Sequence, residues 1–275
     1  MMFVNKGAGF PLLMLLLASL VGCKPAPVDT YLFLAHTYTE NPTRQEVDPR
    51  VVAMDLSVYP LVLLGGDLTH GSTQEASNLH YLDSVFGIRQ PNVHWAIGNH
   101  DYMQPHIVPP FTGKPLFYSF HRKGVTFMVL DSQRDSCGLG PEQLALFQSV
   151  TDTLSASSHL VILQHKLCWL YGNAELHPFE EQANANIGPE AWDTNPNNFH
   201  EVAYPKLAEL EQNGIEVLCI SGDLGVRAKQ FHHQTAEGID FIASGLSRTG
   251  DADDVILKLL HQPNARTLEW RFEPI

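Results

Sequence analysis

The stretch WAIGNHDYM, residues 95–103, ends an apolar run with three residues that have metal or proton chemistry, Asn99, His100 and Asp101. Four other apolar runs of the chain also end in a residue that can bind a divalent cation, through an imidazole or a carboxylate. These residues are His36, Asp67, His165 and Asp223. Ligands at the ends of several strands predict a metal site that is built from distant parts of the chain.

The apolar runs have the length and the continuous apolar character of strands buried on both faces of a sheet. Helical patterns lie between several of them, at residues 73–87, 140–154 and 198–214. This alternation predicts an α/β fold in which helices cover a sheet core, and residues 253–275 predict a final antiparallel hairpin. In open α/β sheets the binding crevice lies beyond the carboxyl ends of the strands, so the strand ends are expected to converge there. The seven expected strands span residues 31–35, 61–65, 92–97, 125–130, 159–163, 215–220 and 239–244.

Three motifs place these residues in a family context. GGDLTHG (65–71) and GNHD (98–101) follow each other about thirty residues apart, and LDSQ (130–133) precedes the strand that ends at His165. In these blocks the sequence resembles the calcineurin-like metallophosphoesterase family, over roughly residues 30–245. The resemblance implies a single domain with a four-layer α/β/β/α sandwich. It also implies a metallophosphoesterase, which hydrolyses a phosphate mono- or diester by attack of a metal-activated water.

The resemblance further implies which residues hold the metal. Asp67 would bridge two divalent cations, and Asn99, His165 and Asp223 would complete the shell of the second one. Mn, Fe or Zn are the expected kinds of cation. Two such cations clamp a phosphate, activate water and stabilise the charge on the oxygens during displacement.

Two further residues receive catalytic roles from the same resemblance. His100 would contact a phosphoryl oxygen or protonate the leaving group. Asp101 would hold the ring of His100 in the useful tautomer.

Two blocks depart from the family pattern, and the first cation loses more ligands by this than the second, which keeps Asp223. Where the family has Asp-x-His, this chain reads HTY from His36 to Tyr38, and the family's Gly-His-x-His corresponds to GDLG, which ends at Gly225. His36 is still a competent ligand, whereas Gly225 supplies no side chain. Either Tyr38 or His70 fills the gap, or the first cation is absent and one remains. His70 stands where the related purple acid phosphatases have a tyrosine ligand.

These departures leave three functional hypotheses. The chain is a two-metal hydrolase, a one-metal hydrolase with an altered substrate, or a degenerate family member that acts as a binding or scaffold lipoprotein in envelope or polysaccharide assembly. Retention of GNHD (98–101) and His165 favours a hydrolase, because a binding protein needs no group to protonate a leaving group.

The start of the chain has the features of an export signal. Lys6 precedes the apolar segment FPLLMLLLASLV, which is too short for a comfortable membrane span. LVGC (20–23) resembles the lipobox of bacterial lipoproteins, so we expect a signal peptide over residues 1–22 and lipidation of Cys23. A cleaved signal with a chance cysteine is the alternative. Residues 23–29 form the tether and residues 30–275 the domain. Lys24 resembles the outer-membrane class, which predicts a lipid-anchored protein on the periplasmic face of that membrane of the bacterial cell envelope.

The net charge of the chain restricts the kinds of molecule that it can bind, and its cysteines can be interpreted separately. The full chain has a net charge of −13, and removal of residues 1–22 takes away only Lys6. Such a charge repels nucleic-acid duplexes and anionic lipids. The expected substrate is therefore a phosphorylated small molecule or glycan, which a local cation would bind. Contact with the membrane is expected only through the lipid anchor. Cys219 is interpreted as a core residue, and a Cys137–Cys168 disulfide is possible in an exported chain.

Two other segments can be interpreted from their residue pattern alone. Residues 166–199 contain no periodicity, and so long a loop in a compact domain is usually functional or mobile. The pair His232 and His233 is interpreted as part of an exposed turn.

Overall fold

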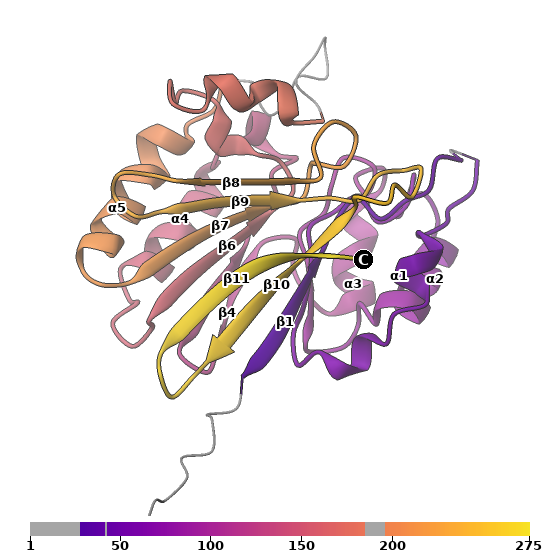
Figure 1. The fold of residues 1–275 in the computed structure, drawn as a ribbon, viewed down its shortest axis with the longest axis horizontal. Coiled ribbons are helices and arrows are strands. Elements are labelled where there is room, and N and C mark those ends of the chain that lie inside the picture. The colour runs from indigo at the N-terminus through magenta and orange to yellow at the C-terminus, as the bar shows by residue number, and fades with distance from the viewer. Residues whose placement is uncertain (1–27, 42, 185–195) are drawn as a thin grey trace, which may run out of the picture.

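Two β-sheets face each other in the computed structural model, which describes residues 28–41, 43–184 and 196–275 (Figure 1). The first sheet contains β1 (Asp29–Leu34), β2 (Val62–Leu64), β3 (Val93–Trp95), β10 (Val255–Gln262) and β11 (Thr267–Pro274), in the order β11-β10-β1-β2-β3. The second contains β4 (Tyr118–Arg122), β5 (Val125–Val129), β6 (His159–Gln164), β7 (Glu216–Ser221), β8 (Gln230–Gln234) and β9 (Asp240–Ser244), in the order β4-β5-β6-β7-β9-β8.

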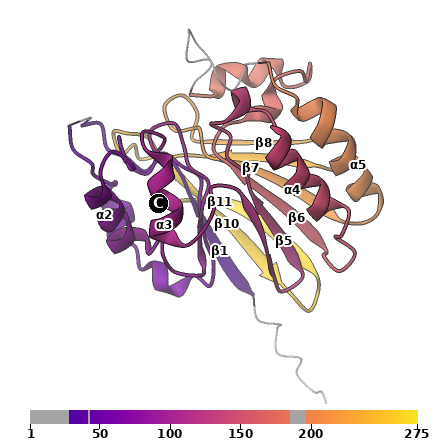
Figure 2. The same ribbon diagram turned by 180° about the vertical axis from the view of Figure 1, so that it is seen from behind.

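Helices cover the outer side of each sheet (Figures 1 and 2). The first sheet packs against α1 (Pro49–Val52), α2 (Ala76–Phe86) and α3 (Val108–Thr112). The second packs against α4 (Pro141–Thr151) and α5 (Tyr204–Gln212). This arrangement confirms the predicted α/β/β/α four-layer sandwich in a single domain.

The alternation of side chains along β1 shows why its sequence is apolar at every position from Tyr31 to Leu34. Tyr31 and Phe33 point into the core between the two sheets, whereas Leu32 and Leu34 pack against the helices of the first sheet. Successive side chains of a strand point to opposite faces, so a strand between two apolar layers needs apolar residues on both.

Strand direction sets where the site forms. β1, β2 and β3 are parallel to one another, and so are β5, β6, β7 and β9. The parallel strands of a sheet end at the same edge. The expected site residues follow five of these strands directly, which brings them to the edge where the two sheets meet.

All seven expected strands and the C-terminal hairpin are confirmed, as are helices within the three expected segments. Two strands were not expected, β4 and β8. The interpretation of His232 and His233 as an exposed turn is wrong, because both lie in β8, the edge strand that pairs with β9.

The expected leader and most of the tether, including Cys23, lie outside the described residues. Within the described part of the chain, none of the helices combines the length and the apolar character needed to cross a membrane.

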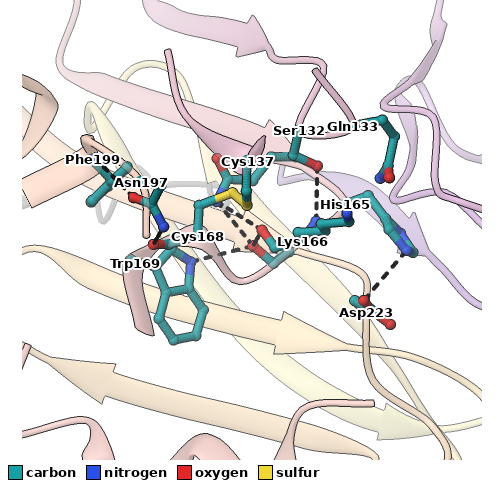
Figure 3. Close-up of a disulfide and its surroundings, with 12 residues drawn as sticks. Ser132, Gln133, Cys137, His165, Lys166, Cys168, Trp169, Asn197, Phe199 and Asp223 are labelled. Carbon is teal, nitrogen blue, oxygen red and sulfur yellow. Dashed lines mark hydrogen bonds and ion pairs between the residues drawn. A yellow bond between two sulfur atoms is a disulfide. The ribbon is translucent and has the colours of Figure 1, made fainter. Parts of the chain in front are cut away.

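The irregular segment after β6 is joined to the loop after β5 by a disulfide (Figure 3). Cys137 ends the short 3₁₀ helix η3 (Asp135–Cys137), and Cys168 begins η4 (Cys168–Leu170), with a Cα–Cα distance of 5.9 Å. The same segment continues through η5 (His177–Gln182) and a π-helical turn, η8 (Phe199–Ala203). Cys219 is a free, buried core residue, as expected.

Candidate metal centre

Four of the strand-end residues meet around one ring nitrogen, Nε2 of His165. This atom lies 3.2 Å from Asn99 Oδ1, 3.5 Å from Asp67 Oδ2 and 3.8 Å from Asp223 Oδ2. Ligand atoms that surround a cation at about 2.0–2.2 Å are separated from one another by distances of this order. The side chains therefore have the spacing of a common coordination shell.

His165 is oriented for this role by the backbone of the first sheet. Its Nδ1 lies 2.7 Å from the carbonyl oxygen of Gly65, so Nδ1–H donates and the lone pair of Nε2 faces the acidic residues. Hydrogen bonding of the second ring nitrogen to a carbonyl group is the usual support of a metal-binding histidine. Figure 3 shows the ring of His165 pointing toward Asp223.

The carboxylates at this point are buried and incompletely paired. Asp223 is 2% exposed, and its Oδ2 is buried without a hydrogen-bond partner among the described residues. Burial raises the pKa of Asp67 well above its ordinary value, and the negative charges of Asp101 and Asp223 raise it further. A buried, partnerless carboxylate oxygen is costly in free energy unless a cation compensates it. The donor set thus fits a divalent cation held by Asp67, Asn99, His165 and Asp223.

Two of the strand-end residues, His36 and Asp67, also have an unusual backbone conformation. His36 and Asp67 have φ angles of 52° and 55°, in the left-handed region that non-glycine residues rarely adopt. Such conformations cost free energy and cluster at functional sites. The backbone of Gly98 lies very close to Asp67, since a Cβ on Gly98 would be 2.1 Å from Asp67 Oδ1, and this close approach supports the unusual conformation of Asp67.

At the position expected for the first cation, the ring of His36 is hydrogen-bonded on both of its nitrogens. His36 Nδ1 bonds to the carbonyl oxygen of Leu246 at 2.9 Å, and its Nε2 lies 2.9 Å from the hydroxyl of Tyr38. Burial lowers the pKa of His36 to about 3, so the ring is neutral and Nε2 accepts the Tyr38 O–H. Ligand atoms of His36, Asp67 and Asp223 also lie within 4.8 Å of one another, so these three residues could hold an ion, and the hydroxyl of Tyr38 bonds to Nε2 of His36.

Gly225 and His70 each have contacts with the backbone near the first position. Gly225 has a φ of 121°, and a Cβ there would lie 2.0 Å from the carbonyl oxygen of Leu246, so the glycine cannot be exchanged for a larger residue without backbone movement. His70 Nε2 bonds to the carbonyl oxygen of Thr39 at 2.8 Å. Gly225 therefore contributes no side chain to the first position, and the ring nitrogen Nε2 of His70 is bonded to the backbone.

His100 lies at the edge of this cluster, next to Tyr38. Its backbone N–H donates to Asp67 Oδ1 at 2.9 Å, and its Nε2 is 3.5 Å from the Tyr38 hydroxyl. The side chain of His100 is partly exposed, so it can meet a bound ligand. This position is compatible with the predicted contact to a phosphoryl or leaving-group oxygen.

Asp101 has contacts that differ from its expected support of His100. Its carboxylate accepts hydrogen bonds from the backbone N–H groups of Asp67, Leu68 and Gly98, at 2.7, 3.1 and 2.8 Å. Ser72 Oγ and Trp95 Nε1 also donate to it. The tight turn at residues 98–101 points this side chain inward, where it fixes the two loops that carry Asp67 and Asn99. Asp101 is thus a positioning residue of the backbone.

Comparisons with known proteins support the fold. No protein-family model matches the chain, and no curated protein matches it. Among solved structures, a dimetal phosphatase from Danio rerio superposes with a TM-score of 0.50 at 14% identity, over 90% of this chain and 99% of that one. Vps29 from Chaetomium thermophilum and Vacuolar Protein Sorting 29 from Cryptosporidium parvum each share 10% identity, cover 90% of this chain and 97% and 98% of their own, and reach TM-scores of only 0.34 and 0.38. The chain therefore has the metallophosphoesterase fold.

Proposed function

We propose that this chain, whose fold is that of a dimetal phosphatase, is a phosphoesterase that works with one divalent cation. The observation that carries the proposal is the convergence of Asp67, Asn99 and Asp223 on Nε2 of His165, with Asp223 Oδ2 buried and unpartnered. Mn, Fe and Zn all accept such a mixed set of imidazole, carboxylate and amide ligands.

The chain's own residues supply the remaining parts of a hydrolytic site. When bound, a divalent cation lowers the pKa of water and stabilises charge on phosphoryl oxygens. His165 is held by the Gly65 carbonyl so that Nε2 faces this position. His100 can donate a proton to the leaving oxygen, and the hydroxyl of Tyr38 lies on the same side, 3.5 Å from His100 Nε2.

A binding or scaffold function is the second candidate. The hydrogen bond between Tyr38 and His36 and the missing side chain at Gly225 favour it, because they remove one half of a two-cation site. The retention of His100 at the edge of the cluster favours hydrolysis, because a binding protein has no use for a leaving-group acid.

Metal analysis paired with hydrolysis assays tests these alternatives. We expect the purified protein, incubated with Mn²⁺, to retain about one ion per chain, and Asp223→Asn and His165→Ala to retain far less. We expect turnover of p-nitrophenyl phosphate or bis(p-nitrophenyl) phosphate. His100→Ala should keep the ion but lose at least about a hundredfold in kcat, the scale of general acid catalysis. His106→Ala, at an exposed histidine, is the matched control.

The other results would each contradict part of the proposal. Two ions per chain would contradict the single-cation site. One ion without turnover of either ester, together with a His100→Ala variant indistinguishable from wild type, would support the binding protein. A wild-type chain that retains no ion would overturn both the metal site and the hydrolase.

We further propose that the protein is anchored in the bacterial envelope through a lipid on Cys23 and acts there on a phosphorylated small molecule or glycan. The sequence of residues 1–29 and the negative charge of the chain support this proposal.

A further inference from the structure

A pocket of about 390 Å³ lies directly beside the metal centre, on the side of the loops that follow β7 and β9. Its lining includes Gly225 and Ser247. A Cβ on Gly225 would lie only 3.0 Å from His36 Nδ1, and Ser247 follows Leu246, whose carbonyl oxygen bonds to the same nitrogen. The pocket therefore borders His36, whose ligand nitrogen lies within 4.8 Å of ligand atoms of Asp67 and Asp223.

Arg248 gives this pocket a free positive charge. It lines the pocket with an exposed side chain, and it makes no hydrogen bond or ion pair with any residue that the structure describes. Its charge also acts on the neighbouring cluster. Burial lowers the pKa of His36 and of His70, and Arg248 adds to both effects.

The other charged groups of the pocket do not compete for this role. Lys229 Nζ is only 2.6 Å from the carbonyl oxygen of Gly225 and 2.9 Å from Asp251 Oδ2, so its charge is already neutralised. Glu40 also lines the pocket, is exposed, and disfavours an anion by its charge. The lining has two acidic residues, Glu40 and Asp251, and two basic ones, Lys229 and Arg248, so an anionic group would pair with Arg248 itself and not with a net positive charge of the pocket.

We infer that Arg248 and this pocket bind a second anionic group of the substrate, a carboxylate or a further phosphate, beyond the phosphoryl group at the metal centre. This inference rests on the proposed function and specifies its substrate class: a phosphate ester whose alcohol part carries another negative charge. In a chain with a net charge of −13, such a substrate needs a local cation at each of its charged ends, and a guanidinium pairs well with both carboxylates and phosphates.

Binding of non-hydrolysable phosphonates tests the inference without requiring turnover. Phenylphosphonate, para-carboxyphenylphosphonate and benzene-1,4-diphosphonate would be titrated calorimetrically into the Mn²⁺-loaded protein. We expect at least one of the two doubly charged ligands to bind about tenfold more tightly than phenylphosphonate, a typical effect of one charge-assisted pair. The preference should shrink in 0.5 M NaCl, which shortens the Debye length. The ligand preferred identifies the second group as a carboxylate or a phosphate.

Three variants assign the preference to the pocket. Arg248→Gln should abolish it and leave phenylphosphonate binding unchanged, Arg248→Lys should retain part of it, and Glu40→Gln should increase it. Arg271→Gln, at an exposed arginine on β11, is the control. Equal affinity of the wild type for all three ligands, or an unchanged preference in Arg248→Gln, would overturn the inference. Selective binding without hydrolysis of the corresponding esters would overturn the proposed phosphoesterase and leave the subsite intact.

Discussion

At the scale of single residues, the convergence of the strand-end residues was predictable but the direction of each side chain was not. Asp67, Asn99, His165 and Asp223 follow apolar strands, and strand ends are where a buried chain releases its polar groups. The direction of the Asp101 side chain, in contrast, was not predictable from the sequence. Its turn points the carboxylate toward three backbone N–H groups, and such a turn depends on φ and ψ angles that residue types alone do not specify.

Asp101→Asn tests this role in the backbone. The amide has one acceptor oxygen in place of two, so buried donors lose their partner, and each such loss costs about 1–3 kcal/mol. We expect the free energy of unfolding to fall by about 3 kcal/mol, measured by urea denaturation, with weaker Mn²⁺ retention because both ligand loops depend on this carboxylate. Asp253→Asn, at an exposed aspartate, should be neutral. Wild-type stability combined with a loss of kcat would instead support the expected role of Asp101 in orienting His100.

At the scale of elements, the buried strands were predictable, and the two edge strands of the second sheet, β4 and β8, were not. β6, for example, is apolar at every position from Leu160 to Leu163 because both of its faces are covered. β8 has the sequence QFHHQ and buries only Phe231, so it lacks both the continuous and the alternating apolar pattern. An edge strand is held by hydrogen bonds to one neighbour, here β9, and this pairing leaves little trace in residue types.

The disulfide between Cys137 and Cys168 belongs to this scale, because it ties the loop after β5 to the loop that begins at His165. Closing a loop with a sequence separation of 31 residues stabilises a fold by about 3 kcal/mol. We expect dithiothreitol to lower the melting temperature by about 6 °C and the Cys137→Ser/Cys168→Ser double variant to melt at this lower temperature with or without reductant. An unchanged melting temperature in protein whose two thiols are shown to be free by mass spectrometry would contradict this.

At the scale of the whole molecule, the number of layers came from the family resemblance and not from periodicity. The alternating pattern predicts strands and helices, but the order in which strands pair is set by contacts far apart in the chain. β10 pairs with β1, joining the last part of the chain to the first and completing a sheet of five strands. No local pattern distinguishes this from a continuation of the second sheet.

The proposed lipid anchor is also a property of the whole molecule, and Cys23→Ser tests it. We expect the wild-type protein to sediment with membranes and to incorporate a labelled palmitate analogue, and the variant to lose the label. One acyl-modified cysteine with several chains gives stable membrane attachment, whereas the charged domain alone is repelled by anionic lipids. Cys219→Ala, at an internal cysteine, is the control. Unlabelled wild-type protein in the soluble fraction would exclude the anchor.

The contact between Gly225 and the carbonyl oxygen of Leu246 has a lasting consequence for this protein. A histidine introduced at residue 225 would collide with the loop after β9, so its side chain could be placed only if that loop moved. Substitution of this glycine alone is therefore not expected to add a cation to the site.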